Sequence, residues 1–303
     1  PLLSLPDPEA QKKALDKLDL VVAIDANYSE NAWYADVLLP SATYLEKSSV
    51  LCTGKGLKPS FRMREKAIDH HTNAKADWWI FKSLAERLGA GEYFKFDDVE
   101  DFWKFQLEGT GVTVEDIKKK GSFSLADKPI WWDRMNDLKF KTPSGKIELV
   151  SSHLTDCGLE SFKPYEKPEK PKEGTFRLAF GRSPVHTHGR TMNNPYLHEI
   201  LPTNTLWINT AEAGKLGIKD KDQVKVTSAD GSHSGTIQAM VTDFIHPETV
   251  FMIHGFGRKI PWQTRGYNRG LGDYRFETGL LDVYDQAGGA IALLECVVSV
   301  EPA

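Results

Sequence analysis

Leu20-Val21-Val22-Ala23-Ile24 is an uninterrupted apolar run that ends at Asp25. Such a run is typical of a strand that is buried on both faces of a parallel sheet. A second apolar run, Val37-Leu38-Leu39, predicts another short buried strand. Upstream, Asp7-Pro8 combines a capping residue with a first-turn proline and predicts the start of a helix. This order of helix, strand, intervening segment and strand favours an α/β sheet.

Helical patterns follow these two strands. Asp77 is the expected N-cap of a helix with apolar residues at helical spacing, and Gly89 is its expected stop. A second helix is expected at 97–107, and residues 122–142 are expected to be irregular. The stretch 163–174 is rich in proline and charge, which predicts a linker.

Beyond this linker the pattern changes to short strands. Alternating apolar residues predict strands at 176–180 and 236–242. Asp230-Gly231 is a hairpin turn signal directly after residues 223–228. A further strand is expected at 290–300. With one short helix capped by Asn209, these features favour a mostly-β domain closed as a barrel.

Length and composition allow two domains. The chain has 303 residues, of which 40% are hydrophobic and 26% are charged. We expect an α/β region over residues 1–170 and the β-barrel over residues 174–303. The net charge of −4 argues against nucleic-acid binding, because phosphate recognition requires a basic excess. No stretch approaches the roughly 20 apolar residues of a membrane helix, so direct membrane insertion is not expected.

The cysteines and histidines do not predict a metal site. Cys52, Cys157 and Cys296 stand far apart and outside any C-x-x-C spacing, so we interpret them as ordinary core or surface residues. His186 and His188 could suggest a metal pair, but no further zinc ligand stands at suitable spacing. The chain begins at Pro1 without an initiator Met or a leader, which favours a fragment or a processed chain.

Three stretches are more specific than their periodicity. The first is Ala35-Asp36-Val37-Leu38-Leu39-Pro40, followed by Glu46, and the second is Thr142-Pro143-Ser144-Gly145-Lys146-Ile147-Glu148. The third begins at Gly181-Arg182-Ser183-Pro184-Val185-His186 and continues to Gly266-Tyr267-Asn268. In this order, over almost the whole chain, they resemble the dimethyl sulfoxide reductase family of molybdenum and tungsten enzymes.

This resemblance implies a fold and a cofactor. Residues 1–170 are similar to the end of the family's dinucleotide-binding α/β region, and residues 174–303 to its six-stranded double-psi β-barrel. The implied cofactor is molybdopterin guanine dinucleotide, two copies of which hold molybdenum or tungsten (bis-MGD). The resemblance also implies that the protein ligand of the metal and a 4Fe-4S cluster lie in an N-terminal part outside this chain. We therefore expect no catalytic residue here, and an isolated chain that is inactive.

The resemblance further implies partners and a reaction. The partners are the N-terminal remainder of the same subunit, an iron–sulfur electron-transfer subunit and a membrane anchor subunit. Periplasmic or outward-facing membrane association is expected, with a cytoplasmic location as the alternative. Tyr44-Leu45-Glu46, Tyr93-Phe94 and residues 112–121 are similar to the thiosulfate, polysulfide and tetrathionate reductases of anaerobic respiration.

Two alternatives to that reaction stay open. One is a relative of the same family that acts on formate, arsenate or another small substrate. The other is a standalone pterin- or nucleotide-binding module without catalysis. A Cys-rich iron–sulfur motif and a metal ligand upstream would favour the enzyme.

A polar, cationic cluster follows the strand predicted at 176–180. A guanine dinucleotide carries a diphosphate and a polar pterin, so its site needs guanidinium groups and hydrogen-bond donors. The resemblance implies that this segment lies against the pterin and the diphosphate, whereas a solvated loop is the interpretation without it. The candidate cofactor-binding residues are Arg182, His186, Thr187, His188, Arg190 and Thr191.

Two further residues are candidates outside that cluster. Asp25 ends an apolar strand, and ligands of nucleotide-binding sheets lie at the carboxyl ends of the strands. Its carboxylate could accept guanine N–H groups or could cap the following turn. Asn268 is similar to a late Asn that faces the pterin in the family, although turn chemistry also favours Asn between Gly266 and Gly270.

Overall fold

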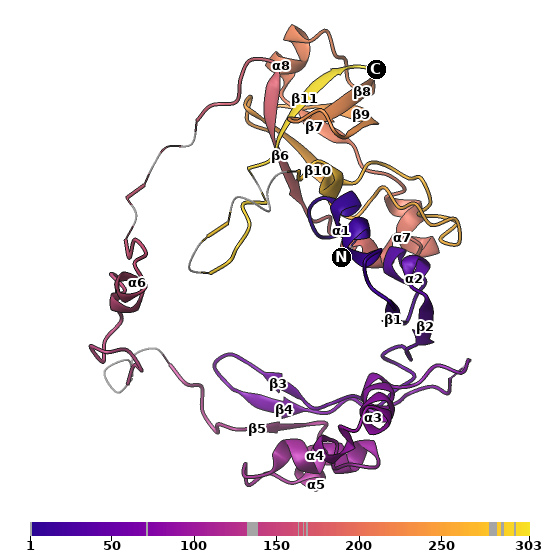
Figure 1. Cartoon of the computed structure of the whole chain (residues 1–303), viewed down its shortest axis with the longest axis vertical. Coiled ribbons are helices and arrows are strands. Elements are labelled where there is room, and N and C mark those ends of the chain that lie inside the picture. The colour runs from indigo at the N-terminus through magenta and orange to yellow at the C-terminus, as the bar shows by residue number, and fades with distance from the viewer. Residues whose placement is uncertain are drawn as a thin grey trace. The chain divides into compact units, whose positions relative to one another are not determined.

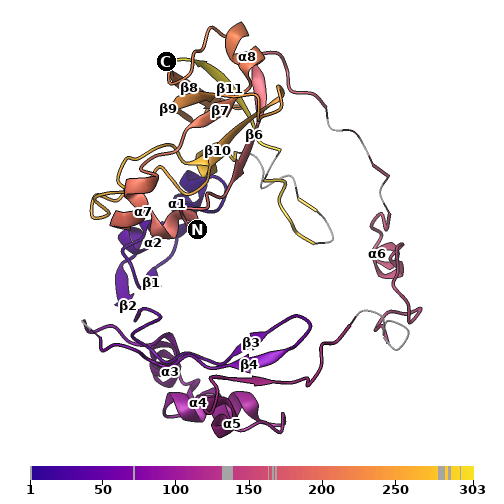
Figure 2. The ribbon, with the colours of Figure 1, turned by 180° about the vertical axis from the view of Figure 1, so that it is seen from behind.

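The computed structural model describes residues 2–70, 72–131, 139–162, 164, 165, 167, 169–278, 284, 285, 288–293 and 295–303. The chain forms two compact units that are not consecutive in sequence. Unit 1 consists of Pro1–Val21, Tyr28–Tyr34 and Glu148–Ala303, and unit 2 of Val22–Asn27 and Ala35–Ile147. Figure 1 labels their elements and Figure 2 shows the same ribbon from behind. The domain division predicted at 170–174 stays a prediction.

Unit 2 contains a two-stranded parallel sheet. Strand β1 (Val22–Asp25) pairs with β2 (Val37–Pro40) in a register that sets Val22 opposite Val37. The two strands are confirmed, but the prediction that they are buried on both faces is wrong. Val22 is 43% exposed and Val37 is 41% exposed. The reason is that each side chain of a two-stranded sheet has only one neighbouring strand to pack beside.

The predicted helix after these strands is α3 (Asp77–Arg87), and Gly89 follows it with φ 77°. Asp77 is not its N-cap, which corrects the sequence prediction. Ala76 occupies the cap position without a side-chain hydrogen bond. The carboxylate of Asp77 instead pairs with Lys47 and accepts the hydroxyl of Ser41. Asp77 therefore forms a tertiary ion pair with Lys47 and does not act as the N-cap of α3.

The rest of unit 2 is a small sheet packed with helices. Three antiparallel strands pair in the order β3-β4-β5, and Trp103 lies fully buried with its ring N–H donated to Ser49 O at 2.8 Å. Strand β5 occupies the start of a segment predicted to be irregular, while Trp132 of that segment lies outside the described residues. The elements are β3 (Cys52–Gly54), β4 (Ser60–Arg62), η1 (Gly91–Tyr93), α4 (Val99–Leu107), α5 (Val114–Lys118) and β5 (Ser122–Ser124).

Unit 1 is built on a closed barrel of six strands, as the sequence predicted. They are β6 (Thr175–Gly181), β7 (Leu206–Ile208), β8 (Gln223–Ser228), β9 (Ser234–Val241), β10 (Thr249–Ile253) and β11 (Val297–Pro302), in the order β10-β6-β11-β8-β9-β7. The pairs β6–β10 and β7–β9 are parallel and the other four are antiparallel. Alternate residues such as Leu178, Val226 and Val298 point inward and are fully buried. The last strand begins at Val297, later than predicted.

Unit 1 also contains short helices. Asp7 caps α1 (Pro8–Leu15) by accepting Ala10 N–H at 2.9 Å, and Asn209 caps α8 (Thr210–Lys215) by accepting Ala211 N–H at 2.9 Å. Both caps were predicted. Among the described residues, the other helices of unit 1 are α2 (Glu30–Tyr34), α6 (Ser152–Asp156), η3 (His188–Thr191), α7 (Pro195–Ile200) and η4 (Asp273–Arg275).

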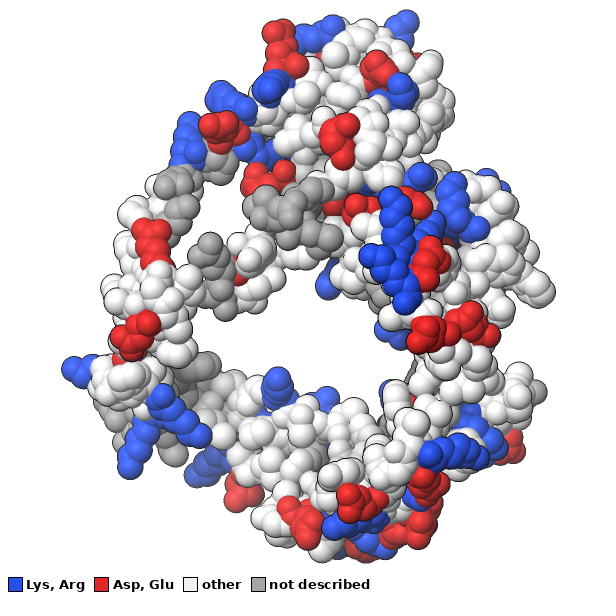
Figure 3. Space-filling model, in the orientation of Figure 1, with Lys and Arg blue, Asp and Glu red and all other residues white. Residues whose placement is uncertain are grey.

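Two sequence expectations concern the rest of the chain. The described residues of the linker predicted at 163–174 belong to no helix or strand. Within the part of the chain that the structure describes, none of the helices is both long and apolar enough to span a bilayer. Basic and acidic side chains are interspersed over the face that Figure 3 shows.

Candidate functional site

The cationic cluster begins where two parallel strands of the barrel end together. Ile253 of β10 pairs with Gly181 of β6, and the N–H of His254 donates to Gly181 O at 2.9 Å. The next residue after each strand is therefore Arg182 on one side and His254 on the other. Because parallel strands present their carboxyl ends at the same edge, this edge collects both cationic side chains.

The loop after β6 is held by two of the candidate residues. His186 is only 5% exposed, with Nδ1 3.2 Å from Thr191 Oγ1 and Nε2 2.8 Å from Leu201 O. Thr191 Oγ1 also accepts the N–H of Thr187 at 3.0 Å. Both ring nitrogens of His186 thus already lie within hydrogen-bonding distance of chain atoms. The structure places His186 and Thr191 as supports of the loop, and direct cofactor contact by either stays a prediction.

The other cluster residues present exposed side chains. Arg182, Thr187, His188 and Arg190 are all exposed. Among the described residues neither Arg182 nor Arg190 has an ion-pair partner. His188 has φ 48° and its ring lies edge-on to that of His254, with 5.4 Å between centroids. A non-glycine residue in this left-handed region costs about 1 kcal/mol, so the surrounding contacts must hold it in place.

Two glycines let the loop after β10 approach other backbone segments closely, and one of these segments is the turn at His188. A Cβ on Gly255 would lie 2.6 Å from the carbonyl carbon of His188, and one on Gly257 would lie 2.5 Å from Gly272 N. Both glycines also have positive φ, at 100° and 80°. The loop after β10 therefore packs backbone against backbone on η3, which supports the conformation of His188.

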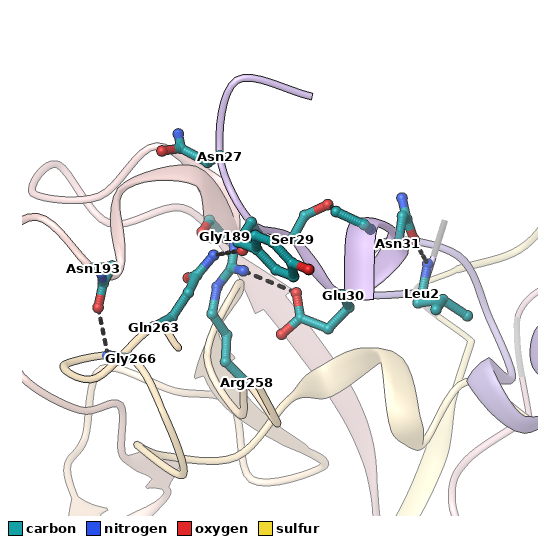
Figure 4. Close-up of polar contacts among 12 residues, drawn as sticks. Leu2, Asn27, Ser29, Glu30, Asn31, Gly189, Asn193, Arg258, Gln263 and Gly266 are labelled. Atoms are coloured by element: carbon teal, nitrogen blue, oxygen red, sulfur yellow. Dashed lines mark hydrogen bonds and ion pairs between the residues drawn. The ribbon is translucent and has the colours of Figure 1, made fainter. Parts of the chain in front are cut away.

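A largely buried ion pair ties residues 28–34 to the same loop. Arg258 Nη1 lies 2.8 Å from Glu30 Oε2, and the side chains are 6% and 12% exposed. Arg258 also donates to Gly189 O in η3, and Gln263 donates its amide N–H to Tyr28 O. Figure 4 shows Arg258 between Glu30 and Gly189. One guanidinium thus joins α2, the cluster and the loop after β10.

The far end of that loop has a separate anchor. Asn193 Oδ1 accepts the N–H of Arg265 at 2.9 Å and that of Gly266 at 3.4 Å (Figure 4). Asn268 adopts φ 53°, and its Oδ1 accepts Lys259 Nζ at 2.8 Å. The structure therefore gives Asn268 the turn conformation that its glycine neighbours indicate, and its contact with the pterin stays a prediction.

Asp25 belongs to unit 2, whereas the other candidate residues belong to unit 1. Its Oδ1 accepts the N–H of Asn27 at 3.1 Å, which is the turn-capping alternative that its position allowed. Contact of Asp25 with guanine stays a prediction.

The sequence analysis missed a buried acidic pair behind the strand ends. Asp273 and Glu277 are 0% and 3% exposed, and Asp273 Oδ2 lies 2.7 Å from His254 Nδ1. This hydrogen bond raises the pKa of His254 above its usual value. Burial, reinforced by the charge of Asp273, raises the pKa of Glu277 to about 7. One signal in the sequence could have drawn attention to this site. His254 directly follows an apolar strand and precedes Gly255-Phe256-Gly257.

The cysteines take the ordinary positions expected of them. Cys296 is buried with its thiol donated to Phe276 O at 2.7 Å, and burial raises its pKa to about 12. Cys52 and Cys157 are exposed. No group of three or more His, Cys, Asp or Glu side chains is placed to hold a metal ion among the residues that the structure describes.

Comparison with known families shows to which family this chain belongs. The family model described as Molybdopterin oxidoreductase matches residues 1–87. The one described as Molydopterin dinucleotide binding domain matches residues 176–276, which include the whole cationic cluster. The chain belongs to the molybdopterin oxidoreductase family. Its barrel is the domain of this family that binds the molybdopterin dinucleotide.

Individual relatives of this molybdopterin oxidoreductase act on different substrates. The chain is 32% identical over 285 residues to the thiosulfate reductase molybdopterin-containing subunit of Salmonella typhimurium, with 86% of this chain and 37% of that protein covered. It is 32% identical over 262 residues to the F420-dependent formate dehydrogenase subunit alpha of Methanocaldococcus jannaschii, with 83% and 37% covered. The chain thus spans well under half the length of these relatives.

A solved structure shows the same fold. Acetylene hydratase from Pelobacter acetylenicus superposes with a TM-score of 0.82 at 20% identity, over 100% of this chain and 43% of that one. The predicted combination of an α/β region and a double-psi β-barrel is therefore confirmed for this molybdopterin oxidoreductase chain.

The residues of the barrel edge fit the family's cofactor. Arg182 and Arg190 supply guanidinium groups that are not used in ion pairs with other described residues, and a diphosphate is an acceptor that suits them. His188 adds an exposed imidazole beside them. Backbone N–H and C=O groups of η3 face the loop after β10. This donor set matches an anionic dinucleotide far better than it matches an apolar ligand.

Proposed function

We propose that this chain is the cofactor-binding C-terminal portion of the catalytic subunit of a molybdenum or tungsten oxidoreductase that reduces a sulfur compound such as thiosulfate or polysulfide. The observation that carries the proposal is the cationic edge at the ends of β6 and β10, within the matched dinucleotide-binding domain. There Arg182 and Arg190 bind the diphosphate, and His188 and Asn268 bind polar edges of the pterin.

When bound, the cofactor supplies a metal centre at which oxygen or sulfur atoms are transferred. The chain's own residues bind and orient it. His186 and Thr191 hold the loop that carries the two arginines, and the Arg258–Glu30 ion pair holds the loop after β10. No residue of this chain is assigned to catalysis. The metal ligand and a 4Fe-4S cluster belong to the N-terminal remainder of the subunit.

The proposal includes partners and a location. An iron–sulfur electron-transfer subunit and a membrane anchor subunit would assemble with the complete subunit on the periplasmic or outward-facing side of a membrane. The 32% identity to a thiosulfate reductase subunit over 86% of this chain supports the sulfur substrate. The formate dehydrogenase relative, also at 32%, favours formate oxidation as the second candidate.

Cofactor content and turnover of the complete subunit test the proposal. We expect the wild-type protein to contain pterin dinucleotide and to reduce thiosulfate, polysulfide or tetrathionate with a reduced viologen. Arg182→Ala and Arg190→Ala should each lower cofactor occupancy about tenfold, because each removes a charged hydrogen bond, while circular dichroism stays unchanged. Arg87→Ala in α3 of unit 2 is the matched control. Formate or arsenate turnover without sulfur-compound turnover would reassign the substrate, and full occupancy of both variants would refute the cofactor contacts.

A further inference from the structure

We infer that His254 is a further cofactor-binding residue of the barrel edge, and that Asp273 is a positioning residue that holds the His254 ring as a charged donor toward a diphosphate oxygen. This inference rests on the proposed function, because it adds a donor to the same cofactor. Neither residue belongs to the cluster that the sequence singles out.

His254 stands at the end of β10, next to the start of the cationic cluster. His254 follows β10 directly, and its N–H donates to Gly181 O. Arg182 is the residue that follows Gly181 in the sequence. The His188 ring lies edge-on to it at 5.4 Å, and the Phe180 ring lies 5.9 Å away on the barrel side. His254 therefore lies within the cationic edge, although the loop that carries the other residues is a different one.

The two ring nitrogens of His254 have different surroundings. Nδ1 lies 2.7 Å from Asp273 Oδ2, whereas Nε2 makes no hydrogen bond within the described part of the chain. The His254 side chain keeps 15% exposure, so the ring is not sealed inside the protein. A histidine whose Nδ1 donates to a carboxylate is fixed in orientation, and its Nε2 becomes a donor when the ring is protonated.

Asp273 is the carboxylate that contacts the His254 ring. Its side chain is fully buried, and its Oδ1 has no hydrogen-bond partner among the described residues. A buried carboxylate is costly unless a cation compensates it, and the imidazole 2.7 Å away is the group that contacts it. Asp273 therefore favours the protonated ring.

The other charged groups around His254 act in both directions. The Asp273 hydrogen bond raises the pKa of His254, the charge of Glu277 raises it further, and the charge of Arg182 lowers it. An anionic ligand at this edge would offset the repulsion between Arg182 and the charged His254 ring. A diphosphate is such a ligand, whereas the neutral pterin edge would gain less from a second cation.

Cofactor retention by the complete subunit at different pH values tests the inference. Protein purified at pH 6 is dialysed at pH 6, 7 and 8, and the remaining pterin and the guanine nucleotide released by hydrolysis are measured. Wild-type protein should retain both throughout. His254→Gln should lose them about tenfold faster at every pH, because a charged hydrogen bond is removed. His233→Gln and Asp243→Asn are the matched controls.

Two more variants separate positioning from a structural role. Asp273→Asn should resemble wild type at pH 6 and His254→Gln at pH 8, because the ring then deprotonates. Adding His254→Lys to Asp273→Asn should restore retention at pH 8, since an ammonium needs no carboxylate to stay charged. Restored retention in this double variant would also show that the protein folds with Asn at position 273.

The outcomes distinguish this inference from the function on which it rests. A wild-type subunit without pterin dinucleotide overturns both. A loaded wild type with equal retention in His254→Gln overturns the binding role of His254 alone. Retention in Asp273→Asn that does not depend on pH overturns the positioning role of Asp273. Apo subunit with added GDP provides a second readout: weaker GDP binding in His254→Gln supports contact with the diphosphate, and unchanged GDP binding overturns it.

Discussion

Arg258 and Glu30 form an ion pair across 228 residues of sequence, with Nη1 2.8 Å from Oε2. Glu30 belongs to the segment Tyr28–Tyr34, which lies in unit 1 although both of its flanking segments lie in unit 2. The ion pair, together with the hydrogen bond from Gln263 to Tyr28 O, joins this short segment to the barrel unit. Since Arg258 also bonds Gly189 O, the same contact holds the cationic cluster.

Removal of one partner of this pair should destabilise unit 1. Glu30→Gln is expected to cost about 3 kcal/mol of unfolding free energy, because it removes the charged partner that contacts the largely buried guanidinium of Arg258 at 2.8 Å. Denaturant unfolding of the complete subunit measures the change. Glu301→Gln, in the exposed pair with Lys225, is the control and should cost no more than about 1 kcal/mol. Equal costs for the two variants would show that the pair is not stabilising.

The stability of unit 1 should fall as pH rises through the range from about 5 to about 7 in which Glu277 loses its proton, and should fall further once pH passes the raised pKa of His254. The hydrogen bond to Asp273 raises the folded-state pKa of His254, and burial raises that of Glu277 to about 7. Both groups bind protons more tightly in the folded state. Their stabilisation is therefore complete below the unfolded pKa values and is lost as pH rises through the folded ones.

Glu277→Gln isolates the carboxyl's part of this pH dependence. The variant should lose the decline between the unfolded pKa of 4.5 and about pH 7, and keep the decline due to His254 at higher pH. Thermal unfolding monitored at half-unit pH steps measures this difference, with Glu301→Gln as the control. A Glu277→Gln curve that runs parallel to wild type would contradict the prediction.

Gly255 should not tolerate a side chain. Gly255→Ala places a Cβ 2.6 Å from the His188 carbonyl carbon at a φ of 100°, so η3 has to move and cofactor retention should fall severalfold. Gly231→Ala is the matched control: it also has positive φ, at 71°, but nothing lies within 4 Å of its Cβ. The control should cost about 1 kcal/mol of stability without affecting the cofactor. Comparable cofactor loss in both variants would show that the close approach is unimportant.

Residues 1–303 alone should be catalytically silent. The proposal places the metal ligand and the iron–sulfur cluster in the remainder of the subunit, so this chain would contact the dinucleotide on one side only and bind it weakly. Purified residues 1–303 should contain far less than stoichiometric molybdenum or tungsten and show no viologen-dependent turnover. The complete subunit is the positive control. Stoichiometric metal or substantial turnover in the short chain would place the active site within it.

Local chemistry was sufficient to predict much of the fold. The alternation at 176–180 and 236–242, the Asp230-Gly231 turn and the Asn209 cap depend on neighbours within a few residues, and each was found where expected. The burial of β1 and the role of Asp77 were predicted wrongly. An apolar run shows what could be buried but not what covers it, and a capping residue can be recruited by a distant cation such as Lys47.

The sequence by itself determined several strands of the barrel, the cationic cluster from Arg182 to Thr191 and the likeness to a molybdenum enzyme family. Apart from the β8–β9 hairpin, only the tertiary structure decided which strands pair. The parallel pairing of β6 with β10 brings His254 beside Arg182, and the buried Asp273 then contacts the imidazole. Periodicity specifies which face of a strand is apolar, but it carries no information about the partner strand. Contacts between residues tens or hundreds of positions apart depend on that pairing, because the closure of the barrel and the packing of its side chains together determine which strands are neighbours.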